Sequence, residues 1–398
     1  MIAALLCVAM SAHAVLPRLQ PLIDASPAGS VLRPPPGRYA GPVVIDKPLS
    51  LDGGGRVSVD GGGRGSVLTI RAPDVSVSGM HLSNSGSTHD GIDAGVLVEA
   101  DYARVAGNRI DQVLFGIHLK QANHASIVGN LIRGRPADLS LRGDGLRLWN
   151  SRYNRIEGNT LDATRDITVA NSSDNRFIGN TIRNGRYGMQ LVFSPRNRIE
   201  GNRISHNSTG IVVLYSDDVS ILGNHIEHAR DVAGAGLAFK DSSQILVEGN
   251  TVLHCTVGAE ANSPTHPANI IRFINNRFAY NVTGMYFYGE NGGHLVHGNR
   301  FEQNLVQVGV SGPKSARGND WSGNWWDDYQ GFDRNRDGIG DTPYELWYYA
   351  DRIWMENPNA RFFRNSPVLE LLDFLERLAP FSAPDLILRD SRPVLQAR

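Results

Sequence analysis

The sequence predicts an all-β fold, a right-handed parallel β-helix solenoid in which each coil contains three short strands. The first observation is a Gly-Asn dipeptide that recurs every 21 to 29 residues and is followed, two residues later, by an aliphatic or aromatic residue. A period near 22 residues that tolerates insertions is typical of solenoids. The repeated asparagines are Asn108, Asn130, Asn159, Asn180, Asn202, Asn224, Asn250, Asn276 and Asn299, with Asn275 in place of glycine before Asn276.

A second motif, Gly-apolar-x-apolar, lies between successive Gly-Asn motifs and has the period of two expected of a strand with one buried face. A third apolar pair precedes each Asn motif. Three short strands in about 22 residues cannot form one flat sheet, so each is expected to pair with its equivalent one coil away, about 4.8 Å along the axis. Right-handed winding is expected because parallel crossovers overwhelmingly take that hand. The second motif begins at Gly95, Gly116, Gly145, Gly188, Gly210, Gly236 and Gly284.

The repeated asparagines fall at the bend between two of these strands. An Asn side chain hydrogen-bonds to nearby backbone and tolerates left-handed torsions, while the preceding Gly permits close approach. Stacked asparagines can also bond to one another in a ladder. We therefore interpret each repeated Asn as structural and not as catalytic.

The N-terminal residues predict export. Residues 2–10 form an apolar run followed by Ser11-Ala12-His13-Ala14, which contains a small-x-small cleavage site, so residues 1–14 are predicted to be a signal peptide. Later apolar runs stay below the roughly 20 residues that a membrane-spanning helix needs. The β-helix is then expected over residues 15–312, and its Pro-rich start suits a lead-in at the end of the solenoid.

Three insertions interrupt the repeat, at residues 134–142, at residues 229–234 and around residues 260–269. Extra residues in a solenoid become loops on one flank, which is commonly the functional side. The chain has 39 basic and 40 acidic residues and a net charge of -1, so no basic field is present to hold nucleic acid. After the predicted signal peptide Cys255 is the only cysteine, which excludes an internal disulfide.

A C-terminal cap is predicted over residues 313–364, where the composition shifts to aromatic residues. Such a density of rings can plug the open end of a β-helix and also offer a surface to a partner. The aromatic residues are Trp321, Trp325, Trp326, Tyr329, Phe332, Tyr344, Trp347, Tyr348, Tyr349 and Trp354.

The cap contains an Asp-rich segment that matches the Asp-x-Asn-x-Asp-Gly pattern of a calcium loop. Tyr344 occupies the position at which an EF-hand has its bidentate Glu, so the segment is not an EF-hand. A structural calcium ion is one interpretation, and a polar turn held by its own hydrogen bonds is the other. The candidate calcium ligands are Asp333, Asn335, Asp337 and Asp341.

Residues 365–398 are predicted to form an amphipathic docking helix and a tail. The helix must bury its apolar stripe either on the solenoid or on another protein or a membrane surface, and the apolar run at residues 386–388 favours a partner. The stripe contains Val368, Leu369, Leu371, Leu372, Phe374, Leu375 and Leu378.

Copper is the metal that the remaining candidate ligands suit best, because imidazole and thiol are copper ligands. Met80, Met189, Met285 and Met355 could add thioether, but Met189 and Met285 occupy the inward phase of the repeat and are expected in the core. Cys255 and each His also have an ordinary structural interpretation. A transient copper site is therefore a hypothesis. Its candidate ligands are His225, His228, His254, Cys255, His294 and His297.

An enzyme is the main alternative, because parallel β-helices often host polysaccharide lyases and epimerases. The carboxylate pairs Asp90/Asp93 and Asp217/Asp218 are explained as turn residues, and no Asp-Pro-His-Asp type motif, Ser/His/Asp order or phosphate loop is evident. We expect a protein that is not an enzyme. A lyase or C5-epimerase that acts on uronate polymers remains the alternative.

Taken together, these features resemble the NosD family of periplasmic maturation proteins for nitrous oxide reductase. The N-terminal resemblance lies in Leu32 to Pro48, and the most specific part is Gly323-Asn324-Trp325-Trp326-Asp327-Asp328-Tyr329 with the Asp-rich segment that follows.

The resemblance implies a periplasmic, non-enzymatic subunit that works with an ABC-type permease and its cytoplasmic ATPase. It further implies a role in copper delivery to nitrous oxide reductase, with a copper chaperone lipoprotein as another partner. The helix predicted after residue 365 then becomes the candidate element that docks onto the permease.

Overall fold

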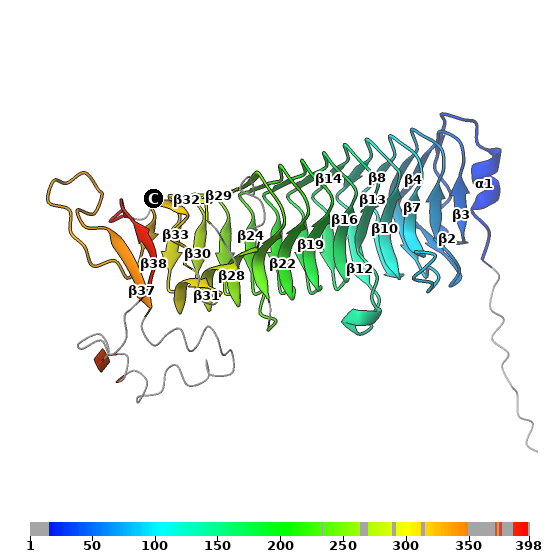
Figure 1. Cartoon of the computed structure of the whole chain (residues 1–398). Coiled ribbons are helices and arrows are strands. Elements are labelled where there is room, and N and C mark those ends of the chain that lie inside the picture. Colours follow the sequence, from blue (N-terminus) through cyan, green and yellow to red (C-terminus); the bar gives the residue numbers. More distant parts are fainter. Residues whose placement is uncertain are drawn as a thin grey trace, which may run out of the picture.

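The computed structural model describes residues 16–232, 234–262, 270–288, 292–311, 315–348, 371, 374–375 and 385–396. These residues form an elongated rod of stacked coils, a parallel β-helix in which one separate column of paired strands has 12 members (Figure 1). The structure confirms the predicted fold class and its three strands per coil. Within the described ranges, no helix is long and apolar enough to cross a membrane.

The first column pairs every strand with the equivalent strand of the next coil, in parallel. It consists of β3 (Val43–Ile45), β5 (Leu68–Ile70), β7 (Ala94–Val98), β10 (Phe115–Lys120), β13 (Leu146–Trp149), β16 (Asp166–Ala170), β19 (Tyr187–Val192), β22 (Thr209–Leu214), β25 (Ala235–Lys240), β28 (Val257–Asn262), β31 (Thr283–Tyr288) and β34 (Val306–Val310).

The other two columns are joined at the N-terminal end of the rod, where long strands bend through both of them. These early strands are β1 (Val31–Leu32), β2 (Gly37–Ala40), β4 (Ser50–Asp60) and β6 (Ser76–Ser83). The second column continues as β8 (Arg104–Ala106), β11 (Ser126–Val128), β14 (Arg155–Glu157), β17 (Arg176–Ile178), β20 (Arg198–Glu200), β23 (Ser220–Leu222), β26 (Ile245–Glu248), β29 (Ile271–Ile274), β32 (Leu295–His297) and β35 (Asp320–Ser322). The third continues as β9 (Arg109–Val113), β12 (Leu131–Gly134), β15 (Thr160–Asp162), β18 (Thr181–Arg183), β21 (Arg203–Ser205), β24 (His225–Glu227), β27 (Thr251–Leu253), β30 (Arg277–Ala279), β33 (Arg300–Glu302) and β36 (Trp325–Trp326).

The core is a stack of inward-facing side chains, one layer per coil. Alternation along each short strand places one residue of the third column inside in every coil, and burial of such a side chain contributes about 1.5–3 kcal/mol. Met189 and Met285 are buried as predicted. The third column contributes Ile110, Ile132, Leu161, Ile182, Ile204, Ile226, Val252, Phe278, Phe301 and Trp326, each no more than 3% exposed.

The repeated asparagines form one continuous ladder at the bend between the second and third columns. Asn202 is representative: its Nδ2 donates to Asn224 Oδ1 at 2.9 Å and to the carbonyl oxygen of Phe177, while its Oδ1 accepts from the Nδ2 and the backbone N–H of Asn180. The residue before each ladder Asn is left-handed, as in Gly201 at φ 63° and in Asn275 at φ 54°. The structural interpretation of these asparagines is confirmed.

The N-terminal end is closed by a short helix that the sequence analysis did not predict, α1 (Gln20–Ala25). Pro21 lies in its first turn, and Leu19 and Ile23 are fully buried beneath it. A six-residue helix presents too few apolar positions for its periodicity to be recognised.

The C-terminal end shows that the coil pattern continues past residue 312. Strands β35 and β36 pair with β32 and β33, so the parallel sheet reaches Trp326. The Trp326 ring stacks between Phe301 and Tyr344 with centroid distances of 4.3 Å on both sides. The expectation that aromatic residues plug this end is confirmed for Trp321, Trp326 and Tyr344, which are 2–6% exposed.

The apolar run at residues 386–388 was assigned to a partner surface, and that assignment is wrong. It lies in β38 (Asp385–Asp390), which pairs antiparallel with β37 (Tyr344–Tyr348) of the cap. Ile387 and Leu388 are 3% and 0% exposed because they complete the plug of this chain's own β-helix. Figure 1 shows this two-stranded sheet across the end of the rod.

Candidate functional site

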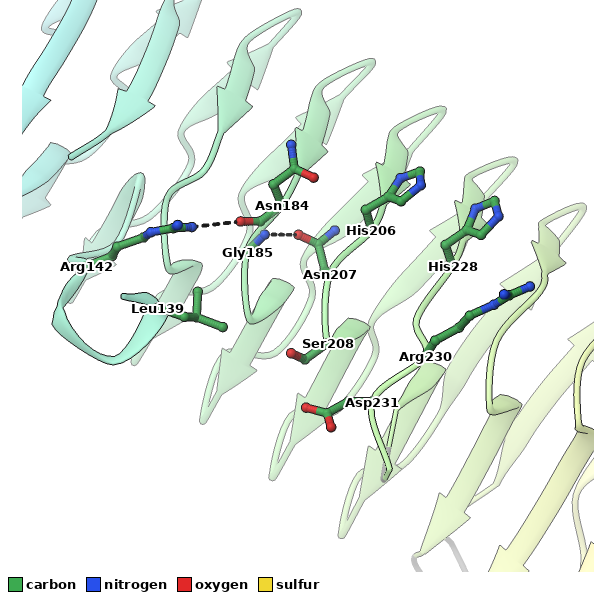
Figure 2. Close-up of a pocket in the computed structure, with 10 residues that line it drawn as sticks. All are labelled: Leu139, Arg142, Asn184, Gly185, His206, Asn207, Ser208, His228, Arg230 and Asp231. Atoms are coloured by element: carbon green, nitrogen blue, oxygen red, sulfur yellow. Dashed lines mark hydrogen bonds between the residues drawn. The ribbon is translucent and has the colours of Figure 1, made fainter. Parts of the chain in front are cut away.

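A shallow trough lies on the flank where the third column turns into the first. The loop after β12, which contains a 3-10 turn at Leu139–Leu141, projects from the rod (Figure 1), and the loop after β24 follows further along the same flank. Between them lies a cavity of about 630 Å³. It is lined by Leu139, Arg142, Asn184, Gly185, His206, Asn207, Ser208, His228, Arg230 and Asp231 (Figure 2).

The two loops each contribute an arginine to the trough, and the backbone of the rod holds both side chains. Arg142 donates from Nε to the carbonyl oxygen of Ala137 at 2.8 Å and from Nη1 to that of Asn184 at 3.1 Å. Arg230 donates from Nε to the carbonyl oxygen of His254 at 3.0 Å. These bonds fix each guanidinium but leave further N–H donors available, since a guanidinium carries five.

A row of stacked rings runs along the same flank. The centroid distances are 4.6 Å between His206 and His228, 5.1 Å between His228 and His254, and 5.3 Å between His254 and Tyr280. All four residues have left-handed torsions, with φ between 54° and 59°, so each occupies the same turn position in successive coils. Coil stacking therefore brings together residues that are 22 to 26 positions apart in the sequence.

His206 and the two arginines are the residues of this site that the sequence analysis missed. A signal for His206 was present, because each ring of the row stands four residues after a ladder Asn, for example His206 after Asn202 and His228 after Asn224. For Arg142 and Arg230, the position inside an insertion identified only the loop and not the direction of the side chain.

The electrostatics of the row keep its central imidazole neutral. Burial lowers the pKa of His228 below its ordinary value, and the neighbouring His206 imidazole lowers it further, while Glu227 opposes the shift. A neutral imidazole can bind a metal or accept a hydrogen bond, whereas a protonated one can only donate.

The candidate copper ligands are only partly brought together. His228 and His254 stack on each other, and Glu227 Oε2 lies 3.2 Å from His225 Nε2 and 3.8 Å from His228 Nδ1. Cys255 must be removed from the set, because its thiol faces the interior, donates to the carbonyl oxygen of Leu253 and is 2% exposed. Burial raises the pKa of this thiol to about 12, so the thiolate that binds metal does not form near neutral pH.

His294 and His297 lie near the far end of the rod, away from the ring row. His294 is 2% exposed and its Nδ1 accepts from the backbone N–H of Ile271, while His297 Nε2 lies 3.0 Å from Asp320 Oδ2. Across the described ranges, no three His, Cys, Asp or Glu side chains are grouped so that they could hold a metal ion. Met80, Met189 and Met285 are in the core, and Met355 lies outside the described residues.

The candidate calcium loop is a turn whose acidic side chains accept backbone hydrogen bonds. Asp333 accepts from the N–H groups of Arg336 and Gly338, Asp337 accepts from that of Ile339, and Asp341 accepts from that of Arg334. Asn335 Oδ1 accepts from the N–H of Asp337.

The residue at the position of the EF-hand Glu, and the residue after it, make other contacts. The Tyr344 hydroxyl donates to Asp328 Oδ2 at 3.1 Å, and Glu345 lies 3.5 Å from the Arg389 guanidinium. The segment can therefore offer a cation only the oxygens of its own four side chains and of its backbone.

The predicted docking helix falls largely outside the described residues. Val368, Leu369, Leu372 and Leu378 lie outside them, as do residues 1–14 of the predicted signal peptide. Leu371, Phe374 and Leu375 are helical and are 56%, 58% and 42% exposed. These three side chains place apolar surface in contact with solvent.

Comparison with known proteins identifies relatives along most of the chain. Residues 128–331 match the family described as "Periplasmic copper-binding protein (NosD)". A Pseudomonas aeruginosa protein named "Probable ABC transporter binding protein NosD" is 31% identical over 385 residues, covering 90% of this chain and 87% of its own length. A Stutzerimonas stutzeri protein of the same name is 30% identical over 393 residues, covering 92% of this chain and 86% of its own length.

Among solved structures, the chain is similar to the A-module of the mannuronan C-5 epimerase AlgE6 of Azotobacter vinelandii, with 13% identity and a TM-score of 0.48 over 75% of this chain and 93% of that one. It is also similar to a family 28 exopolygalacturonase of Yersinia enterocolitica, with 11% identity and a TM-score of 0.45 over 74% and 72%. Likeness at this level concerns the fold alone.

Proposed function

Because the chain belongs to the NosD family, we propose that it is a periplasmic accessory subunit of an ABC-type complex and acts in the assembly of the copper sites of nitrous oxide reductase. The observation that carries the proposal is similarity over nine-tenths of the chain to relatives named ABC transporter binding proteins. Copper enters through the description of the matched family. In this proposal the chain is not an enzyme but a rigid scaffold.

In this proposal, different partners contact different parts of the chain. The permease, joined to its cytoplasmic ATPase, would hold the chain at the membrane through the apolar stripe that includes Leu371, Phe374 and Leu375. A copper chaperone lipoprotein and the reductase would meet the rod itself. Copper is the cargo, and the half-buried, stacked imidazoles of His228 and His254 are donors that the described flank offers for it.

Docking is best tested with point substitutions, because removal of residues 365–398 would also remove β38 and Asp390 from the cap. We expect Leu371→Asp combined with Phe374→Asp to abolish co-purification with the permease from detergent extracts, since charge cannot be buried in an apolar contact. The matched control is Val31→Asp, at a side chain that is 54% exposed at the N-terminal end of the rod and should leave co-purification unchanged. Co-purification of the double variant at the wild-type level would contradict the docking role.

The maturation role has its own readout. In cells that produce the double variant, nitrous oxide reductase should accumulate with reduced copper content, whereas the Val31→Asp protein should restore full content. Full copper content in cells that lack the chain altogether would rule out the proposed role. Incubation of the pure protein with alginate or pectin serves as a separate check, since new unsaturated ends or altered uronate ratios would show a lyase or an epimerase.

A further inference from the structure

Two cations in the trough have no acidic partner. Other arginines of the rod are neutralised, for example Arg183 by Asp162 at 3.0 Å and Arg277 by Glu302 at 2.9 Å, although Arg135 of the loop after β12 is likewise held by carbonyl and hydroxyl oxygens. Neither Arg142 nor Arg230 has a carboxylate oxygen within 4.0 Å in the described chain. Both are instead held by backbone carbonyl groups, which position a guanidinium without neutralising it.

The separation of these cations follows from the regular rise of the rod. Arg142 is anchored on the carbonyl oxygen of Asn184 and Arg230 on that of His254, and these residues occupy equivalent turns three coils apart. With about 4.8 Å per coil, the anchors are about 14 Å apart. An extended peptide rises about 3.4 Å per residue, so two acidic residues four positions apart would span this distance.

The floor between the two arginines suits a peptide that passes over it. It is formed in part by the imidazoles of His206 and His228, and the amide of Asn207 is fully used by Gly185 N–H and by the carbonyl oxygens of Ile182 and Ser205. Asp231 brings one carboxylate to the rim, where its Oδ1 accepts from the N–H of Val232. The two arginines and Asp231 together carry a net charge of +1.

We infer that this trough binds an extended acidic segment of a protein partner, with one carboxylate on Arg142 and a second, about four residues away, on Arg230. A uronate polymer fits less well. It carries a carboxylate on every sugar and hydroxyl groups along its whole length, whereas the trough offers cations only at its two ends and a floor amide that is already hydrogen-bonded. The inference does not depend on copper or on the permease, because it needs only the geometry of this flank (Figure 2).

The test uses synthetic Ser/Gly peptides and the full-length protein at low ionic strength, followed by NMR of the histidine ring protons. A peptide with two glutamates four positions apart should shift the His206 and His228 signals and should bind at least threefold more tightly than a peptide with adjacent glutamates. A peptide with glutamines at the same positions should not bind. Because surface ion pairs are screened by salt, binding should weaken as salt is added.

Arginine variants assign the contacts. Arg230→Gln and Arg142→Gln should each weaken binding of the spaced peptide about three- to fivefold, as expected for one exposed ion pair each. Arg142→Lys keeps the positive charge but loses the guanidinium that holds the loop, so it distinguishes an effect of charge from an effect on loop structure. Arg230→Gln does not alter the loop that contains Arg142. The matched control is Arg198→Gln on β20, where the guanidinium is already paired with Glu200.

Several outcomes would overturn the inference. Equal affinity for the spaced, adjacent and glutamine peptides would show that the trough does not recognise a pair of carboxylates. Unchanged binding by both arginine variants would place the contact elsewhere. Tighter, arginine-dependent binding of a tri-uronate than of the spaced peptide would assign the trough to a carbohydrate in place of a protein segment.

Discussion

At the scale of single residues, the ladder requires an amide at every step. Each buried Asn must accept two N–H groups through Oδ1 and donate twice through Nδ2, as Asn202 does to Asn224 and to the carbonyl oxygen of Phe177. Neither an ionised carboxylate nor an aliphatic side chain can perform both tasks. The ladder therefore explains why Gly-Asn recurs while most other positions vary from coil to coil.

Asn202→Ala tests this reading of the ladder. The substitution leaves the Asn180 amide, the Phe177 carbonyl oxygen and Asn224 Oδ1 with fewer partners inside a dry bend, so we expect a loss of about 3 kcal/mol of stability, seen as a lower midpoint in urea. Asn123→Ala is the control, because its bonds to Asp101 are only partly buried. A loss no greater than that of the control would contradict a structural ladder.

His118 is a buried histidine whose hydrogen-bonding capacity is unsatisfied. It is 3% exposed, and neither ring nitrogen has a hydrogen-bond partner in the described structure. Burial, with the nearby positive charges of Arg147 and Lys120, lowers its pKa from 6.5 to about 4, although Glu99 opposes the shift.

The resulting pH dependence has a definite sign. The folded protein binds the proton less readily than the unfolded chain, so protonation of His118 adds no cost well above pH 6.5 and destabilises the fold as pH falls from 6.5 towards 4. At pH 5 the effect is about 2 kcal/mol. His118→Leu should raise the urea midpoint at pH 5 by more than at pH 7.5, and an equal shift at both pH values would show that the histidine is not held neutral.

Residue roles were predictable where the repeat decides them. The roles of the asparagines and of Met189 follow from their positions in the repeat alone, because a repeat position that faces the interior of the rod does so in every coil. The ring row was not recognised as a whole, because it needs the offset of four from each Asn to be followed across coils of unequal length. The directions of Arg142 and Arg230 depend on loop backbones for which the sequence offers no periodic signal.

At the scale of elements, the cap ends two hydrogen-bond ladders with carboxylates. Asp390 Oδ2 accepts from the backbone N–H and the Nδ2 of Asn324 and from Trp326 Nε1, each at 3.1 Å. A second ladder runs from Asn281 through Asn304 and Gln307 to Asp327. A carboxylate suits a terminus because it only accepts and so leaves no donor unpaired.

Asp390→Ala should loosen the cap selectively. It leaves three buried donors at the end of the ladder without an acceptor, at a cost of several kcal/mol to the docking of β38. We expect red-shifted tryptophan emission as Trp326 gains solvent and early proteolysis near residue 385, with the β-sheet circular dichroism retained. Asp385→Ala, at the exposed start of the same strand, is the control. A rigid cap in the Asp390 variant would show that β38 is held by its apolar residues alone.

The Asp-rich turn gives a second prediction at this scale. We propose that it binds a structural calcium ion, so calcium should raise the thermal midpoint of the cap and a chelator should reverse the gain. Asp337→Asn should abolish the response, because its amide oxygen can still accept from Ile339 while the charge is lost. Asp320→Asn, outside the turn, should respond like wild type. An equal midpoint with calcium and with chelator would leave a turn closed by hydrogen bonds only.

Elements were predictable to the extent that they repeat. The strands and the aromatic plug were recognised, whereas α1 and β38 were not. The apolar run of β38 was assigned to a partner because its own partner strand, β37, lies about 40 residues earlier and follows no period. Pairing between distant, non-repeated segments cannot be read from local pattern.

At the scale of the whole molecule, the trough and the cap lie at different positions along the rod. The trough lies on one flank in the middle of the rod, and the cap closes the end that leads to the exposed apolar residues near position 374. Neighbouring coils touch only each other, so a contact made at the cap need not disturb the trough. A partner held at the end and another held on the flank would be kept at a fixed distance.

That fixed distance is a consequence of the asparagine ladder. Because the ladder holds each coil one strand spacing from the next, the axial distance between equivalent turn positions is a whole number of strand spacings. Adding or losing one period between the two trough loops would change their separation by about 4.8 Å and leave the local structure of each loop intact. A chain with a different number of coils would therefore hold the two loops at a distance that differs by a whole number of strand spacings.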